Sequence, residues 1–155
     1  MSRAIAIQAR RLGKTYGRGK RRIQAVKNLD LNVQAGQVYG FLGPNGAGKT
    51  TTIRMLLGLI HPDQGTVALY GHSVQQRHDV LRRVGAIVER ASFYDFLSGQ
   101  RNLEVLARTS GCHDRSRITA LLGQVGLAGR ASQPVGGYST GMKQRLGLAA
   151  ALLHD

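Results

Sequence analysis

A glycine-rich stretch from 40 to 52 constrains the fold more than any other part of the chain. It reads Gly-Phe-Leu-Gly-Pro-Asn-Gly-Ala-Gly-Lys-Thr-Thr-Thr and contains the spacing Gly43-x4-Gly48-Lys49-Thr50. This is the spacing of the phosphate-binding loop, or P-loop. Its glycines let backbone N–H groups approach phosphate oxygens closely, and a run of such amides forms an anion-binding nest. The stretch therefore predicts that the chain binds a nucleotide.

The segments on either side of this loop support the prediction. Residues 37–42 form a short, mostly apolar run that is typical of a buried strand. Residues 51–57 have an apolar stripe that is typical of a helix. A glycine-rich turn with a stray lysine is the alternative, but the strand and helix context favours a true P-loop.

The chemistry of the motif assigns roles to its side chains. The Lys49 ammonium is expected to bind the outer phosphates, and the Thr50 hydroxyl is expected to ligate Mg²⁺. The positive end of the following helix adds to the attraction for phosphate. The residues predicted to bind the nucleotide in this stretch are Gly43, Pro44, Asn45, Gly46, Ala47, Gly48, Lys49, Thr50 and Thr51.

Length and composition are those of a water-soluble α/β domain. The chain has 155 residues, of which 42% are hydrophobic, and β-like segments alternate with helix-like ones. No apolar run approaches the roughly 18 residues that span a bilayer. The N-terminus lacks the pattern of a cleavable signal, and the single cysteine excludes an internal disulfide. These features predict a cytoplasmic location.

The net charge is strongly positive. The chain has 22 Lys and Arg against 8 Asp and Glu, a formal charge of +14. This balance is compatible with binding to nucleic acid, anionic lipid or an acidic partner. A solvated basic surface is the favoured interpretation, because no basic run interleaves with aromatics as in single-strand binders. The basic cluster 18–22 is predicted to be an exposed hairpin tip.

Periodicity and capping signals give the order of elements along the chain. Short helices or helical turns are predicted at 77–83, from Ser98 through 106, from Asp114 or Ser116 through 125, and at 142–153. Strands are predicted at 5–9, 23–33, 66–70 and 84–88, besides the strand before the P-loop. The helices after residue 97 have no strands between them, which indicates a helical insertion on an α/β core.

Four motifs in order resemble one known family. They are Leu12-Gly-Lys-Thr-Tyr16, the Walker A loop at 43–50, a Q-loop-like segment at 84–94, and a signature-like segment at 138–142. The chain resembles the ATP-binding subunit of an ATP-binding cassette (ABC) transporter, most of all the bacitracin-resistance and lantibiotic-immunity type of exporter. The resemblance covers essentially the whole chain.

The resemblance implies an architecture. It is an α/β fold, a P-loop NTPase-like nucleotide-binding domain with an antiparallel β subdomain and a helical insertion. The expected parts are a core at about 1–94, a helical subdomain at 95–135, and the signature motif with its following helix at 136–155. The implied cofactors are ATP and Mg²⁺.

The same resemblance assigns residues outside the P-loop to the nucleotide. Tyr16 would stack on adenine, although a partly buried tyrosine at a strand end is the plain alternative. Ser139 and Gly141 would reach the γ-phosphate held by a second ATP-binding subunit, so that two domains enclose two ATP molecules. A simple helix N-cap is the other interpretation of Ser139, and both can hold at once.

Two positions depart from the common family pattern. Glu89 stands where most of the superfamily has glutamine, and a carboxylate there would bind Mg²⁺ more strongly than an amide. With Lys49, it is the predicted catalytic pair. In the signature segment Thr140 and Met142 replace a glycine and a glutamine. Methionine donates no hydrogen bond, so contacts to the partner's nucleotide should rest on Ser139 and Gly141.

An expected segment of the family is not found in this sequence. No apolar run ends in Asp-Glu, the pattern of the Walker B strand, and the later switch histidine is also missing. Because water positioning and charge stabilisation dominate phosphoryl transfer, we expect a C-terminally incomplete domain with weak nucleotide binding and poor hydrolysis. The incomplete parallel core should also be marginally stable.

The function expected from the resemblance is that of an energy-coupling subunit of an ABC exporter. Its partners would be a transmembrane permease subunit and a second ATP-binding subunit, with the chain peripheral on the inner face of the cell membrane. The alternatives are a nucleic-acid-associated ABC ATPase, supported only by the charge, and a non-hydrolysing truncated remnant. Nucleic acid is the less favoured partner.

Overall fold

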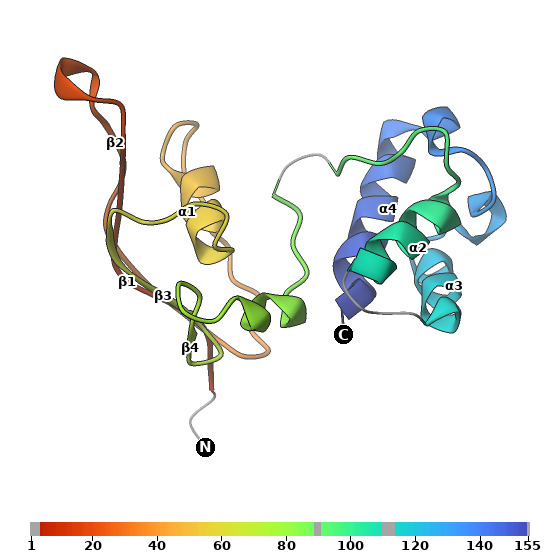
Figure 1. The fold of residues 1–155 in the computed structure, drawn as a ribbon, viewed down its shortest axis with the longest axis horizontal. Helices are drawn as coiled ribbons and strands as arrows, with labels where there is room; N and C mark the ends of the chain where they lie inside the picture. Colours follow the sequence, from red (N-terminus) through yellow and green to blue (C-terminus); the bar gives the residue numbers. More distant parts are fainter. Residues whose placement is uncertain (1–3, 89–90, 110–113, 155) are drawn as a thin grey trace. The chain divides into compact units, whose positions relative to one another are not determined.

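The computed structural model describes residues 4–88, 91–109 and 114–154. The chain divides into two compact units, residues 1–81 and residues 82–155, which are described separately below. Figure 1 shows strands with a helix beside them in the first unit and a cluster of helices in the second. The finer division into 1–94, 95–135 and 136–155 stays a prediction.

The first unit is built on an antiparallel sheet with the strand order β2-β1-β3-β4. Its central strand β1 pairs with β2 along its whole length, for example Ala9 with Leu31, and Ile7 also pairs with Leu69 of β3. Apolar side chains alternate along these strands, which buries one face of the sheet. The strands are β1 (Ile5–Tyr16), β2 (Ile23–Gln34), β3 (Gln64–Leu69) and β4 (His72–Ser73).

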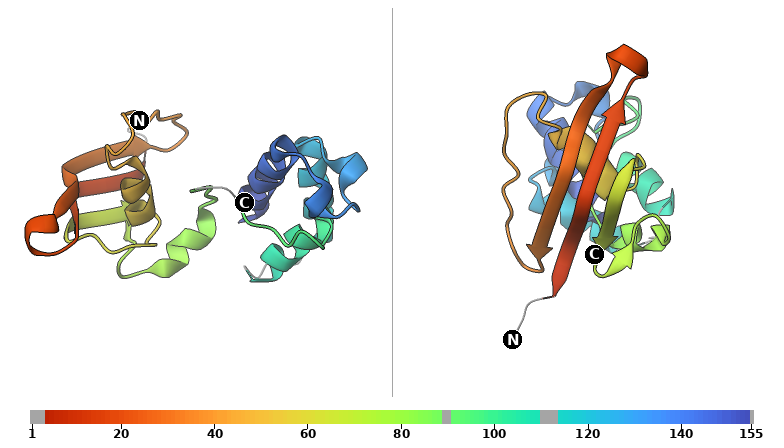
Figure 2. Two further views of the ribbon diagram at one scale, coloured as in Figure 1. Left: turned by 90° about the horizontal axis from the view of Figure 1, so that it is seen from above. Right: turned by 90° about the vertical axis from the view of Figure 1, so that its left-hand side faces the viewer.

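Helix α1 (Lys49–Leu56) covers the apolar face of this sheet and contacts β1, β2 and β3. Figure 2 shows the helix on one side of the strands. Met55 of the helix is buried, as are Leu12 and Val67 of the sheet. Thr52 is buried too, so the helix turns the face opposite Thr50 to the sheet. The predicted helix at 51–57 is confirmed and begins two residues earlier.

The basic segment 18–22 lies at the tip of the hairpin between β1 and β2, as predicted. A single 3₁₀ turn at Gly19–Arg21 closes the hairpin, and Gly17 and Gly19 take positive φ there. All five residues of the segment are exposed. The tip extends beyond the rest of the sheet, as Figure 1 shows.

The predicted strands at 37–42 and 84–88 are wrong for this structure. Both segments are irregular, and Val38 and Leu42 are 102% and 91% exposed. A strand exists only through hydrogen bonds to a neighbouring strand, and a strand of a parallel sheet is buried only where both faces of the sheet are covered. Within the described part of each unit no strand pairs with either segment, and apolar residues such as Val38 stay uncovered.

The second unit is helical. Leu103, Leu122, Leu127 and Leu146 lie at the centre of its apolar core. Three predicted N-caps are confirmed: Ser98 accepts from the Arg101 N–H, Asp114 from Ser116 and Arg117, and Ser139 from Met142. The helices are α2 (Gly99–Thr109), α3 (Arg115–Gln124) and α4 (Thr140–Ala151), and 3₁₀ turns occupy His78–Arg83, Ala128–Arg130, Val135–Gly137 and Leu152–His154.

Candidate functional site

The P-loop has a conformation that only glycine adopts easily. Gly46 and Gly48 both have φ of 83°. The Ala47 N–H donates to the Pro44 carbonyl at 3.2 Å, which closes a tight turn ahead of α1. Gly48 is the N-cap of that helix and also lies against β2, since a Cβ there would overlap the Ala25 carbonyl oxygen. The turn and its glycines therefore fix where the helix starts.

The Lys49 ammonium lies over this loop. Its Nζ donates to the carbonyl oxygen of Gly43 at 2.6 Å and to that of Pro44 at 2.7 Å. An ammonium has three N–H donors, so one remains for an oxygen of a bound anion. These two loop carbonyls thus hold the Lys49 ammonium beside the loop.

The N-terminus of α1 differs from those of α2, α3 and α4. The latter three are capped by the side chains of Ser98, Asp114 and Ser139. Gly48 has no side chain, so the first N–H groups of α1 receive no such cap. Free amides, the helix dipole and the ammonium together form a site that fits a phosphate group.

The other residues predicted in this stretch surround the loop. Thr50 is exposed at the first turn of α1, where its hydroxyl is accessible, and Thr51 is half-buried. Gly43 lies close to Lys49, since a Cβ there would be 3.9 Å from the lysine Cδ. Pro44, Asn45, Gly46 and Ala47 are exposed. The structure therefore brings the P-loop residues together at one helix end.

Tyr16 ends strand β1 and is 41% exposed. The Nζ of Lys14 lies 5.8 Å from the centre of its ring. An exposed ring at a strand end offers a face on which a base can stack. Both this interpretation and the plain strand-end tyrosine are compatible with the structure.

The signature segment belongs to the second unit. The Ser139 Oγ accepts the Met142 N–H at 3.3 Å, which leaves its own O–H free to donate. Gly141 is exposed, and a Cβ there would meet nothing within 4 Å, so packing within the chain does not require glycine. Glu89, the other predicted Mg²⁺ ligand and catalytic residue, lies outside the described residues.

Two buried polar residues, one in the signature segment and one on α2, have structural roles that were not predicted. Tyr138 donates its O–H to the Arg130 carbonyl at 2.6 Å, and burial raises the pKa of its phenol. The Asn102 side chain accepts the Tyr94 N–H and donates to the carbonyls of Tyr94, Leu97 and Ser98. The sequence did contain a signal for Asn102, because it is a polar residue on the apolar stripe of the helix at 99–109.

The segment 94–98 is hydrogen-bonded to the residues that come just before the signature segment. The Val135 N–H donates to the Leu97 carbonyl at 2.9 Å, and the Gly136 N–H to the Asp95 carbonyl at 2.8 Å. Lys143 on α4 forms an ion pair with Asp95 at 2.9 Å. Loop positions that follow the Q-loop-like segment are thereby coupled to the helix that Ser139 caps.

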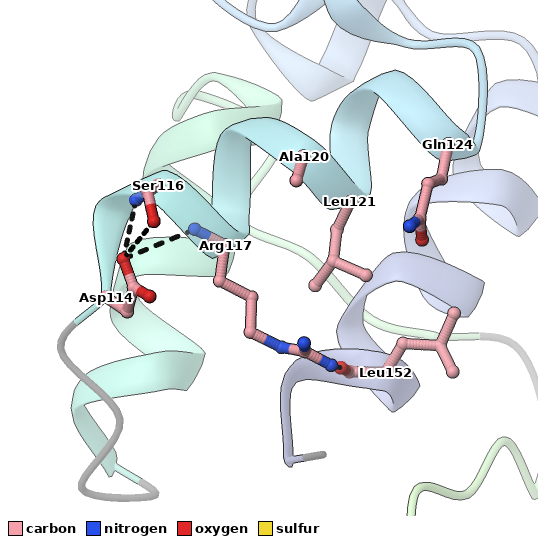
Figure 3. Close-up of a pocket in the computed structure, with 7 residues that line it drawn as sticks. All are labelled: Asp114, Ser116, Arg117, Ala120, Leu121, Gln124 and Leu152. Atoms are coloured by element: carbon pink, nitrogen blue, oxygen red, sulfur yellow. Dashed lines mark hydrogen bonds between the residues drawn. The ribbon is translucent and has the colours of Figure 1, made fainter.

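The described part of the second unit includes two hollows that bear on the site. One of about 440 Å³ is lined by Asp114, Arg117 and Leu152, and Figure 3 shows the Asp114 carboxylate turned to the N-terminus of its own helix. The other, of about 680 Å³, lies between α4 and the segment containing Ile87 and Ala91. Among the described residues no group of His, Cys, Asp and Glu could hold a metal ion, and no helix has the length and apolarity to cross a membrane.

Comparison with known proteins decides the family. The family described as ABC transporter matches residues 26–155. The chain belongs to this family. Among its relatives are the bacitracin transport ATP-binding protein BcrA of Bacillus licheniformis, 48% identical over 92% of this chain, and the lantibiotic transport ATP-binding protein SrtF of Streptococcus pyogenes, 38% identical over 96%. The resemblance drawn from the sequence is confirmed.

Solved structures support the same assignment. The ATP-binding subunit of an ABC transporter is 26% identical and has a TM-score of 0.82 over 96% of this chain and 62% of that chain. The dimeric ATP-binding cassette MJ0796 bound to ADP and Pi, 24% identical, has the same fold with a TM-score of 0.84 over 96% of this chain and 69% of that chain. The predicted ABC ATP-binding fold is therefore confirmed.

The chain spans about half the length of several of these relatives. It covers 46% of the B. licheniformis protein and 45% of the daunorubicin/doxorubicin resistance ATP-binding protein DrrA of Streptomyces peucetius, but 62% of SrtF. The motifs from Tyr16 to Gly141 all lie within the region shared with these proteins.

Proposed function

We propose that this ABC transporter ATP-binding domain binds Mg-ATP through the loop 43–51. The observation that carries the proposal is the Lys49 ammonium, held over the loop by the carbonyls of Gly43 and Pro44 at an uncapped helix N-terminus. Thr50 and Glu89 would hold the magnesium ion, which neutralises phosphate charge when bound. The chain's own amides and Lys49 would orient the phosphates.

Removing one hydroxyl tests the magnesium part of this proposal. Thr50→Val keeps the shape of the side chain but removes the proposed Mg²⁺ ligand. We expect the variant to lose most of the gain in ATP affinity that Mg²⁺ gives the parent chain, while affinity without Mg²⁺ stays the same. Titrations with ATP in Mg²⁺ and in EDTA measure this gain. The same gain in both proteins would contradict the role of Thr50.

The second part of the proposed function is energy coupling in an exporter. Ser139 and Gly141 would contact the γ-phosphate on a second ATP-binding subunit, and Tyr16 would stack on the adenine of the chain's own ATP. The free Ser139 O–H and the uncrowded Gly141 support this, since both leave room for a partner's phosphate. The names of the relatives, which include bacitracin and lantibiotic transport, support an export role.

A membrane partner would dock near the segment that follows Glu89, by analogy with the family. Tyr94 and Phe96 are 54% and 76% exposed and their ring centres are 5.8 Å apart, whereas Phe93 packs against the core. Exposed aromatic pairs are frequent anchors at interfaces. The Asn102 contacts hold the backbone here, so the two rings can be removed without releasing the loop.

Co-purification with the permease subunit tests this docking site. We expect Tyr94→Ala with Phe96→Ala to reduce the amount of permease recovered with the chain by about tenfold, as for hot-spot aromatics. Ile23→Ala, which removes a 69% exposed apolar side chain from the other unit, serves as the control. Unchanged recovery with the double variant would rule out this site, and the proposed ATP binding would stand.

A further inference from the structure

We infer that Asp63 is a positioning residue that holds Tyr16 in place for the nucleotide base. This inference rests on the proposed function, because it gives Tyr16 the role of stacking on adenine. Asp63 is 47 residues from Tyr16 in the sequence and lies in the loop between α1 and β3. No motif assigns it a role.

The side chain of Asp63 binds the two residues that precede Tyr16. Its Oδ1 accepts from the Lys14 Nζ at 2.8 Å, and its Oδ2 accepts from the Thr15 N–H at 2.7 Å. The Asp63 backbone N–H donates to the Gly13 carbonyl at 2.9 Å. Three consecutive residues of β1 are thus bound by one aspartate.

The end of β1 needs such support because β3 does not extend along it. The last pair between the two strands is Gly13 with Gln64, where β3 begins. Beyond this point the β1 backbone has β2 on one side only, and the pairing is irregular between Leu12 and Lys14 and between Lys14 and Thr15. The Asp63 carboxylate takes the place of the missing strand neighbour for the Thr15 N–H.

Lys14 links this contact to the ring itself. Its Nζ also donates to the His61 carbonyl at 2.7 Å, and it lies 5.8 Å from the centre of the Tyr16 ring. Its side chain is only 17% exposed, so the ammonium is held among these partners. The Lys14 ammonium and the Thr15 N–H lower the pKa of Asp63, which therefore stays ionised at neutral pH. The Asp63 carboxylate thus holds both the β1 backbone, through the Thr15 N–H, and the Tyr16 ring, through Lys14.

A comparison of two ligands separates positioning of the base from support of the fold. ATP carries the adenine that Tyr16 would contact, whereas inorganic tripolyphosphate carries only the phosphates. We expect Asp63→Asn to weaken ATP binding by roughly three- to tenfold, a loss of the size typical of one ordinary hydrogen bond, and to leave tripolyphosphate affinity unchanged. Asp79→Asn, which removes another exposed, ion-paired carboxylate of the same unit, should change neither.

A second pair of variants tests whether the effect passes through the ring. In the Tyr16→Ala background Asp63→Asn should have no further effect on ATP affinity. Additive losses, or equal weakening of ATP and tripolyphosphate, would overturn the inference and leave the proposed function standing. If the parent chain binds tripolyphosphate but gains nothing from adenosine, the inference fails. If it binds neither ligand, the proposed function fails, and the inference falls with it.

Discussion

Lys49→Ala will weaken ATP binding about tenfold to a hundredfold, the loss expected for a charged hydrogen-bond donor to phosphate. The ammonium lies 2.6 Å and 2.7 Å from the Gly43 and Pro44 carbonyl oxygens, so it already occupies the mouth of the loop. Alanine removes the positive charge and frees the two carbonyls, whose negative ends then face the incoming phosphates. Equilibrium titration with ATP at fixed ionic strength measures the loss.

The control for this variant is Lys27→Ala, which removes an equal charge from an exposed position on β2. If ATP were attracted only by the general positive charge of the protein, the two variants would lose the same ATP affinity. That attraction would also decrease with added salt. If Lys49 contacts phosphate specifically, only Lys49→Ala loses ATP affinity. Equal affinities of parent and Lys49→Ala would contradict the placement of phosphate at this loop.

Gly48→Ala will destabilise the first unit and remove nucleotide binding together. The residue has a φ of 83°, a conformation that costs a non-glycine residue about 1–2 kcal/mol. Its Cβ would also overlap the Ala25 carbonyl oxygen and lie 3.1 Å from the Val26 Cγ2. Overpacking of this kind typically adds about 1–3 kcal/mol. Because Gly48 is the N-cap of α1, relief of the overlap must move the helix start away from β2.

Gly46→Ala separates the cost of the positive φ from the cost of overpacking against β2. Gly46 has the same φ of 83°, but a Cβ there would meet nothing within 4 Å. This variant should lose only the conformational part, about 1–2 kcal/mol of unfolding free energy. Urea unfolding of both variants, followed by ATP titration, measures the difference. Equal losses would show that contact with β2 does not fix the position of Gly48.

Local patterns predicted the elements that depend on local physics. The glycine spacing of 43–50 placed the turn before α1, and the side chains of Ser98, Asp114 and Ser139 marked helix starts. A cap acts within three residues of its helix, so the sequence contains the whole interaction. The hairpin tip at 18–22 was predictable for the same reason, since a solvated basic turn needs no distant partner.

The two missing strands show the limit of this approach. Segments 37–42 and 84–88 have the apolar content of buried strands, but apolarity reports only a preference for burial. Whether a strand forms depends on which other segments lie beside it. In the structure Val38 is fully exposed and Ile87 is 46% exposed, so this preference is not met.

Contacts between distant segments were equally hidden. Asp63 binds Thr15 across 48 residues, and Lys14 binds the His61 carbonyl across 47. In the sequence Asp63 belongs to an ordinary Pro-Asp turn. Its function as a substitute strand partner follows only from where β3 begins. Sites that rest on a motif were therefore predictable, and the residues that position them were not.

Titration of the purified chain with ATP in the presence of Mg²⁺ tests the central claim most directly. The account predicts saturable binding of one nucleotide per chain, with an affinity that falls when EDTA replaces Mg²⁺ and when Lys49 is alanine. Binding that is unsaturable, or that is the same in the parent chain and in Lys49→Ala, would contradict it.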